Sequence, residues 1–140
     1  MILPSHRLID LPVRSDERGS LAFAQYPQHI PFPPQRIFYF YGLPSGCARG
    51  GHAHRRLEQF ILMLAGGCEA VVDNGVECRR VSLSTPSVAL YIPPMLWLEL
   101  SGFTPNSVCA VLASDVYDEA DYIRDRTEFD RLVPSGIPAG

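Results

Sequence analysis

The sequence predicts an all-β domain, built as a sandwich or barrel, that ends in one short α-helix. Prolines and glycines divide the chain into short runs rich in Val, Ile, Leu, Phe and Tyr, which recur at intervals of about ten residues. The tripeptide "DNG" at 73–75 separates two of these runs and is typical of a β-hairpin turn. After residue 116 the pattern changes to apolar residues spaced by charges, as in a helix with one buried face.

Each expected strand is a short run rich in β-branched or aromatic residues and bounded by turn residues. In chain order, the strands are expected at residues 20–25, 36–41, 58–64, 69–73, 76–83, 88–92, 96–100 and 108–113. The segment "YPQHIPFPP" at 26–34 is expected to be an irregular connection, because proline cannot donate a hydrogen bond within a central strand.

The expected helix lies within "YDEADYIRDRTEFDRLV", residues 117–133. Asp118 and Glu119 lie near its start and Arg131 near its end, which is the order of charges that the helix dipole favours. We expect a single domain over residues 1–140, with its core at about 10–132 and a flexible tail at 133–140.

Composition excludes several classes of function. The net charge is −3 and no basic block occurs, so neither nucleic acid nor a membrane surface is an expected partner. No apolar run approaches the ~20 residues of a membrane span, and no signal peptide is recognisable, so a cytoplasmic location is expected. All twelve Lys and Arg residues are arginine, which excludes chemistry that requires a lysine Schiff base or a P-loop lysine. The four cysteines form no CxxC pair and are expected to be reduced thiols.

The segment "GCARGGHAHRRLEQ" at 46–59 carries the strongest sign of chemistry. If it is extended, His52 and His54 point to the same face, because side chains alternate along a strand. Glu58 could join them if the chain bends back after the histidines. The residues alone therefore allow either an acid–base pair or a metal site with two histidines and one carboxylate.

This segment resembles the first motif of the cupin family, which implies a jelly-roll barrel, or double-stranded β-helix. Gly46 is followed after five residues by His52 and His54, and Glu58 and Gly66 complete the motif. The second motif resembles "LYIPPMLWLEL" at 90–100, but Leu98 stands where the third histidine of a metal-binding cupin would fall. No metal ligand and no cofactor are therefore expected.

One branch of cupins is matched along almost the whole core. "RIFYFYG", "RGGHAHRRLEQFIL", "LYIPPMLWLEL" and "VLASDVYDEADYIRDRTEF" resemble the dTDP-4-keto-6-deoxyglucose 3,4-ketoisomerases, which include FdtA-, QdtA- and WxcM-like proteins. The resemblance implies an isomerase that moves a keto group from C4 to C3 through an enediol. It also implies a place in the biosynthesis of 3-amino-3,6-dideoxy sugars, and a homodimer that exchanges N-terminal strands.

The resemblance and the chemistry together nominate the site residues. One of His52 and His54, with His52 favoured, would carry the carbon-bound proton, while the other moves a proton between oxygens or orients its neighbour. Arg49 and Tyr39 complete the expected catalytic set, although a register change of one residue would put Tyr41 in the place of Tyr39. The residues expected to bind the substrate are Arg36, Glu58, Gln59, Tyr91 and Trp97.

Three other functions remain open at this stage. A 3,5-epimerase would use a histidine base on the same keto sugar without moving the carbonyl. A cupin without enzymatic activity would only bind a sugar nucleotide, because a fold alone does not determine function. A metal-dependent cupin enzyme would need His52, His54 and Glu58 to share an ion.

Overall fold

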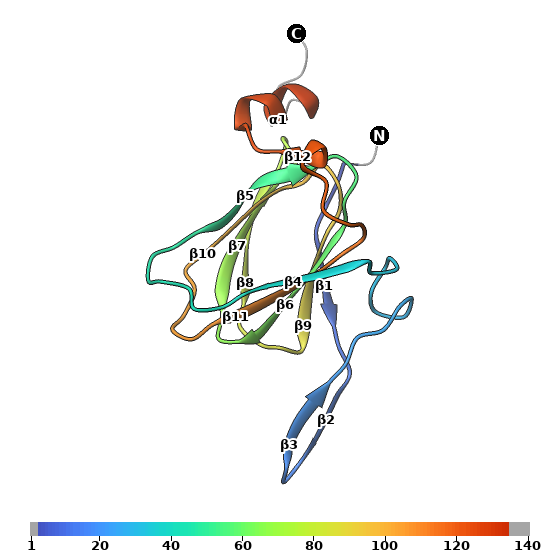
Figure 1. Ribbon diagram of the computed structural model, residues 1–140, viewed down its shortest axis with the longest axis vertical. Helices are drawn as coiled ribbons and strands as arrows, with labels where there is room; N and C mark the ends of the chain where they lie inside the picture. The colour runs from blue at the N-terminus through green and yellow to red at the C-terminus, as the bar shows by residue number, and fades with distance from the viewer. Residues whose placement is uncertain (1–2, 135–140) are drawn as a thin grey trace.

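The computed structural model describes residues 3–134, which form two facing five-stranded antiparallel sheets and a separate hairpin (Figure 1). The strands are β1 (Arg7–Asp10), β2 (Val13–Asp16), β3 (Gly19–Ala22), β4 (Arg36–Phe40), β5 (Arg49–His54), β6 (Gln59–Ala65), β7 (Cys68–Asp73), β8 (Cys78–Leu83), β9 (Val88–Ile92), β10 (Trp97–Ser101), β11 (Val108–Ala113) and β12 (Tyr122–Ile123). A 3₁₀ turn (Glu119–Asp121) lies between β11 and β12, and helix α1 (Arg126–Leu132) follows β12.

The strand order is β1-β9-β6-β11-β4 in one sheet and β12-β5-β10-β7-β8 in the other. Neighbours such as β5 and β10 are distant in sequence, as in a jelly roll, where successive strands cross between the two sheets. The predicted all-β cupin barrel with a short C-terminal helix is therefore confirmed. No helix among residues 3–134 is long and apolar enough to cross a membrane.

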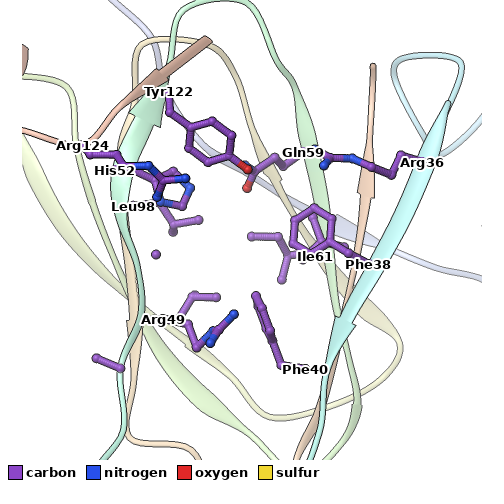
Figure 2. A pocket seen from close by; sticks show the side chains of 14 residues that line it. Arg36, Phe38, Phe40, Arg49, His52, Gln59, Ile61, Leu98, Tyr122 and Arg124 are labelled. Carbon is purple, nitrogen blue, oxygen red and sulfur yellow. The ribbon is translucent and has the colours of Figure 1, made fainter. Parts of the chain in front are cut away.

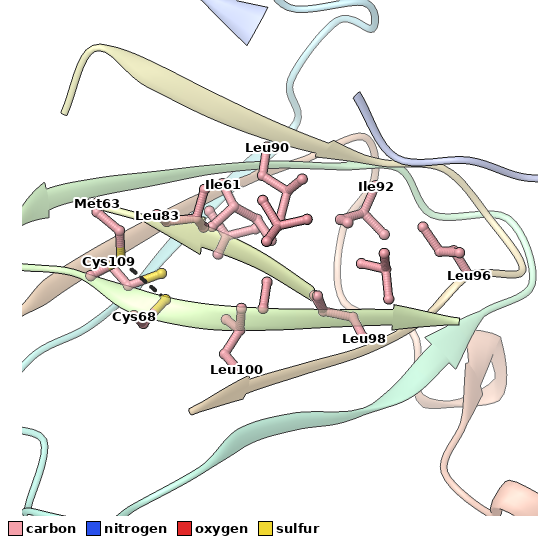
Figure 3. Packing of buried hydrophobic residues seen from close by; sticks show 14 residues of the cluster. Ile61, Met63, Cys68, Leu83, Leu90, Ile92, Leu96, Leu98, Leu100 and Cys109 are labelled. Atoms are coloured by element: carbon pink, nitrogen blue, oxygen red, sulfur yellow. Dashed lines mark hydrogen bonds between the residues drawn. The ribbon is translucent and has the colours of Figure 1, made fainter. Parts of the chain in front are cut away.

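The main core lies between the two sheets, where alternate residues of each strand face inward (Figure 3). In β9, Leu90 and Ile92 join this core, while Ala89 and Tyr91 face the other side of the sheet. Cys68 and Cys109 also lie in the core, and burial raises their thiol pKa values to about 11 and about 12. Both behave as small apolar residues, and the four cysteines are free thiols.

A second cluster covers the outer face of the β1–β4 sheet. Leu11, Ile30 and Phe32, from the N-terminal segment, pack on Phe60 and Ala89 of β6 and β9. The proline-rich segment at 26–34 forms this irregular cover, as predicted. The sheet is consequently buried on both faces over part of its area, which weakens the alternation of polar and apolar residues along its strands.

The strand predictions from 36 to 113 are confirmed to within two residues at each end, and "DNG" joins β7 to β8. The expected strand at 20–25 is shorter, because β3 ends at Ala22. β1, β2 and β5 were not among the expected strands, although the histidine segment was considered as an extended one. The single helix expected at 117–133 is partly wrong: its first half is a 3₁₀ turn and β12, because Tyr122 and Ile123 pair with His54 and Ala53 of β5. Residues 135–140 of the expected tail lie outside the described part of the chain.

The hairpin of β2 and β3 stands away from the barrel (Figure 1). All its strand residues are exposed, including Val13 and Leu21, whose side chains are 41% and 59% accessible. A hollow of about 570 Å³ lies between this hairpin and the outer face of the barrel, lined by Phe23, Leu62 and Leu64 among others.

Candidate active site

A cavity of about 400 Å³ opens between the two sheets, in the part of the barrel that β4, β5 and the C-terminal segment border (Figure 2). This volume lies in the range of small-molecule sites. Its apolar lining includes Phe38, Phe40, Ile61, Leu98, Leu100 and Val111. Its polar lining is Arg36, Arg49, His52, Gln59, Tyr122 and Arg124. A few polar groups therefore converge on an otherwise apolar pocket.

Strand β5 brings the histidines to this cavity. Gly50 and Gly51 have φ angles of 83° and 76°, which residues with side chains rarely adopt. A Cβ on Gly50 would lie 2.7 Å from the carbonyl oxygen of Leu98, so only glycine allows β5 to approach β10 this closely. His52 then pairs directly with Leu98, beside a bulge in β10.

His52 and His54 lie on the same face, as alternation along a strand predicts. Their ring centroids are 4.9 Å apart and the rings are nearly perpendicular, at 86°. His52 lines the main cavity. His54 is only 5% exposed and borders a second cavity of about 220 Å³. Arg36 and Tyr122 line both cavities, so these two side chains form the boundary between the cavity of His52 and the cavity of His54.

Asp121 is the buried partner of His54. Its Oδ2 lies 3.1 Å from Nδ1 of His54, and the residue is 5% exposed. The backbone N–H of Arg56 donates to Oδ1 at 2.8 Å, and that of Leu57 donates to Oδ2 at 3.2 Å. The carboxylate therefore connects the 3₁₀ turn to the end of β5.

Burial determines the charge of both histidines. Burial first, and then the neighbouring His52, lower the pKa of His54 to about 4, although Asp121 acts in the opposite direction. Burial is also the main cause that lowers the pKa of His52. Arg124 acts in the same direction as burial, and Glu119 acts against it. Both rings are thus neutral at pH 7, and a neutral imidazole can accept a proton.

Three arginines bring positive charge to the cavity. Arg36 and Arg49 lie over the rings of Phe38 and Phe40, at 5.1 and 4.2 Å, and neither forms an ion pair within residues 3–134. Arg124 donates to both carboxylate oxygens of Glu119, at 2.8 and 3.0 Å, and lies over Tyr122. The first two guanidinium groups are the ones free to meet an anionic ligand.

Tyr39 lies outside the cavity, contrary to the sequence-based expectation. Residues 36, 38 and 40 of β4 face inward, so Tyr39 and Tyr41 face outward and are 58% and 72% exposed. Their rings lie 6.1 Å apart on the surface of the sheet. Neither register considered for this strand supplies a tyrosine, because the inward positions are phenylalanines.

Tyr91 and Glu58 also lie away from the main cavity. The Tyr91 hydroxyl donates to Oε1 of Glu58 at 2.6 Å, and its ring packs against Phe32 on the outer face of the sheet. Glu58 borders only the second cavity. The metal site imagined for His52, His54 and Glu58 is therefore not assembled, and no group of three His, Cys, Asp or Glu residues suited to a metal occurs between residues 3 and 134.

Trp97 packs under helix α1, at 5.4 Å from Phe129, and its Nε1–H donates to Glu99. It belongs to a small cluster on the outer face of its sheet together with Ala53 and Ile123. Of the nine nominated residues, Arg36, Arg49, His52 and Gln59 line the main cavity, with His54 directly behind.

Asp121, Tyr122 and Arg124 were missed by the sequence analysis. All three lie in the "DEADYIRDR" segment, whose charges suggested a helix rather than part of a site. Figure 2 shows the Tyr122 side chain extending across the cavity toward Gln59. The tyrosine that the sequence analysis sought on β4 is thus supplied by β12.

Comparison with known proteins identifies relatives over the same span. The family model FdtA, described as WxcM-like, C-terminal, matches residues 4–134. A curated relative from Aneurinibacillus thermoaerophilus, a TDP-4-oxo-6-deoxy-alpha-D-glucose-3,4-oxoisomerase, is 37% identical over 128 residues, which is 91% of this chain and 92% of the relative.

Solved structures of similar sequence share the fold. A 3,4-ketoisomerase from Helicobacter canadensis is 37% identical and superposes with a TM-score of 0.87, covering 91% of this chain and 96% of that one. A histidine-to-asparagine mutant of the 3,4-ketoisomerase QdtA from Thermoanaerobacterium thermosaccharolyticum, in complex with TDP-4-keto-6-deoxyglucose, is 33% identical. Its TM-score is 0.88, covering 91% of this chain and 93% of that one.

Proposed function

Because the chain belongs to the FdtA family of WxcM-like proteins, we propose that it is a dTDP-4-keto-6-deoxyglucose 3,4-ketoisomerase. The observation that carries this proposal is a neutral histidine pair, with His54 buried and His52 half-buried, of which His52 reaches a sugar-sized cavity lined by arginines. The relatives named above act on, or were solved with, this class of substrate.

His52 is the residue we assign to the carbon-bound proton, because it lines the main cavity and His54 does not. The ketone at C4 acidifies C3–H, so neutral His52 can remove this proton and form an enediolate. The resulting imidazolium returns the proton to C4, while the proton on O3 passes to O4. The C4 carbonyl becomes a hydroxyl and the C3 hydroxyl becomes a carbonyl, so no external oxidant or reductant is required.

The enediolate and the nucleotide require hydrogen-bond donors and positive charge. We assign the developing negative charge to Arg49, which lines the cavity, and the Tyr122 hydroxyl replaces Tyr39 as the proposed donor to a sugar oxygen. We assign the diphosphate to Arg36 and a sugar hydroxyl to Gln59. Phe38 and Phe40 offer the apolar ring surfaces that Tyr91 and Trp97 were expected to supply.

Replacement of His52 by asparagine tests the assignment. We expect His52→Asn to lower kcat by about 10³-fold or more, with dTDP affinity within about threefold of the wild type, because general acid–base catalysis contributes 10²–10⁴-fold. Tyr39→Phe is the matched control, because its side chain faces outward, and its kcat should stay at the wild-type value. Calorimetry with dTDP and NMR of the sugar product give the two readouts.

The same NMR experiment separates the competing functions. Run in D₂O, a ketoisomerase should give a 3-keto product without deuterium at C5, and deuterium at C5 would indicate the epimerase instead. Tight binding of the sugar nucleotide without turnover by the wild type would leave only a binding function. The configuration at C4 of the product reports the face to which His52 delivers the proton.

We also propose that the protein acts as a homodimer with exchanged N-terminal strands. The exposed β2–β3 hairpin and the apolar hollow beside it support this proposal, since a second copy could cover both. Its product, a 3-keto sugar, is the form on which a transaminase could install an amino group at C3. A cytoplasmic location, where such an amine donor and sugar nucleotide would be available, is part of the same proposal.

A further inference from the structure

We infer that Asp121 is a positioning residue that fixes the tautomer of His54, so that its Nε2 is a hydrogen-bond acceptor beside His52 and Tyr122. This inference rests on the proposed isomerase function for its catalytic consequence, but the tautomer itself can be observed without any substrate. His54 is adjacent in space to both residues, with ring centroids 4.9 Å from His52 and 4.3 Å from Tyr122.

The groups around Asp121 leave it as the acceptor, and His54 as the donor, of the hydrogen bond between them. Two backbone N–H groups point at its two oxygens, and the guanidinium of Arg56 lies 3.9 Å from Oδ1. These three groups are all donors, and a carboxylate accepts hydrogen bonds and donates none. Nδ1 of His54, 3.1 Å from Oδ2, must therefore carry the hydrogen.

A neutral imidazole with its hydrogen on Nδ1 has a lone pair on Nε2. Nε2 of His54 is buried and has no hydrogen-bond partner among residues 3–134. A buried acceptor without a partner is costly unless a ligand or a catalytic step supplies the donor. The neighbours of the ring, His52 and Tyr122, both line the main cavity, so the donor is expected on that side, from His52 or from a sugar hydroxyl.

Asp121 also holds the turn at residues 55–57 through its two backbone contacts, so a purely structural role has to be distinguished. Asp121→Asn is suited to this purpose. The amide oxygen can still accept from a backbone N–H, while the NH₂ group would face Nδ1 of His54. An NH₂ donor facing Nδ1 favours the tautomer of His54 with its hydrogen on Nε2, so Nε2 can no longer accept a hydrogen bond. In a serine protease, the corresponding change in an Asp–His pair preserves geometry but selects the wrong tautomer.

Asp118→Asn is the matched control. It is the same change three residues earlier, on a carboxylate that caps the 3₁₀ turn at Ala120 and makes no contact with His54. The first readout is the ¹⁵N NMR spectrum of the imidazole nitrogens, with His54 assigned from the spectrum of His54→Asn. We expect the Nδ1–H tautomer in the wild type and in Asp118→Asn, and a shift toward Nε2–H in Asp121→Asn.

The second readout is the split between kcat and KM. We expect Asp121→Asn to lower kcat by on the order of 10²–10⁴-fold, as wrong-tautomer substitutions do, while KM and the melting temperature stay close to the control. The inference is overturned if wild-type His54 carries its hydrogen on Nε2, or if Asp121→Asn changes the tautomer without lowering kcat. If that variant does not fold, the wild-type spectrum alone decides the tautomer. A wild type that binds dTDP but never isomerises the sugar would sink the proposed function and leave the tautomer result standing.

Discussion

His54 sits beside a carboxylate and yet is held neutral. An adjacent negative charge normally raises the pKa of a histidine, but here removal of the ring from water, together with His52, outweighs it. Arg36 acts in the same direction as burial, from the strand on the opposite side. Both imidazole rings are therefore neutral near pH 7, and each has a nitrogen that can accept a proton.

The pH dependence of catalysis should reflect the lowered pKa of His52. Because burial lowers the pKa of His52 from 6.5, we expect kcat/KM to stay constant near neutrality and to fall only below pH 6.5, when His52 becomes protonated. Glu119→Gln should move this limb to lower pH, because Glu119 raises the pKa of His52 and also pairs with Arg124. An initial-rate profile of both proteins checks this, and an acid limb at or above pH 7 would contradict it.

The stability of the fold should depend on His54 as the solution is acidified. Above pH 6.5 the ring is neutral in both the folded and the unfolded chain, and burial of the ring carries no protonation penalty. Between pH 6.5 and about 4 only the unfolded chain takes up the proton, so the free energy of unfolding falls as pH falls through this window. The loss attributable to this ring is at most roughly 3 kcal/mol.

Urea unfolding of the wild type and of His54→Asn between pH 4 and 8 measures this contribution. The wild type should lose more stability on acidification than the variant, and the two curves should run parallel above pH 7. Parallel curves over the whole range would show that His54 does not titrate differently in the two states.

At the scale of the elements, β5 owes its position to a close approach that only glycine permits. Gly50→Ala should place a Cβ 2.7 Å from the Leu98 carbonyl at a positive φ, so we expect β5 to shift and both stability and kcat to fall. Gly46→Ala is the matched control, since its φ is also positive, at 79°, but nothing lies within 4 Å of its added Cβ. Its cost should be limited to backbone strain of about 1–3 kcal/mol.

Thermal unfolding and the initial rate of each glycine variant give the comparison. Gly50→Ala is expected to be the less stable protein and to have the lower kcat, because His52 is two residues farther along the same strand. Equal effects of the two substitutions would show that the contact with β10 does not constrain β5.

Sequence patterns placed His52 and His54 on one face of an extended segment, because alternation is a local property of a strand. They could not distinguish the faces of β4, since both carry aromatic residues, nor those of β9 and β10, which are covered on both sides. Tyr91 is partly covered by the N-terminal segment and Trp97 by α1, and both lie away from the main cavity to which the sequence analysis assigned them. Asp121 lies 67 residues from His54 in sequence, and no local pattern reports a contact over that separation.

At the scale of the whole molecule, the exposed apolar surface favours association with a second copy of the protein. Leu21 on the hairpin, Ile37 and Tyr39 on β4 and Leu64 on β6 are each more than half exposed, which is unusual for a protein that stays monomeric. We expect the wild type to elute as a dimer, and Leu21→Asp to weaken it because a charge would be buried without a partner. Light scattering coupled to size-exclusion chromatography measures the mass.

Leu132→Asp is the control for the dimer, because Leu132 is 47% exposed but lies on α1, away from the hairpin (Figure 1). It should leave the mass unchanged. A monomeric wild type at micromolar concentration would contradict the proposed exchange of strands.

The contact between Asp121 and His54 also has a consequence for the order of folding. β1 to β11 contain every strand of the two sheets except β12, so the sheets can pair before the segment at residues 119–124 docks on β5. His54 acquires its partner, and the cavity its Tyr122 and Arg124, only when that segment docks. A chain with a nearly complete barrel would therefore still lack part of the proposed catalytic site.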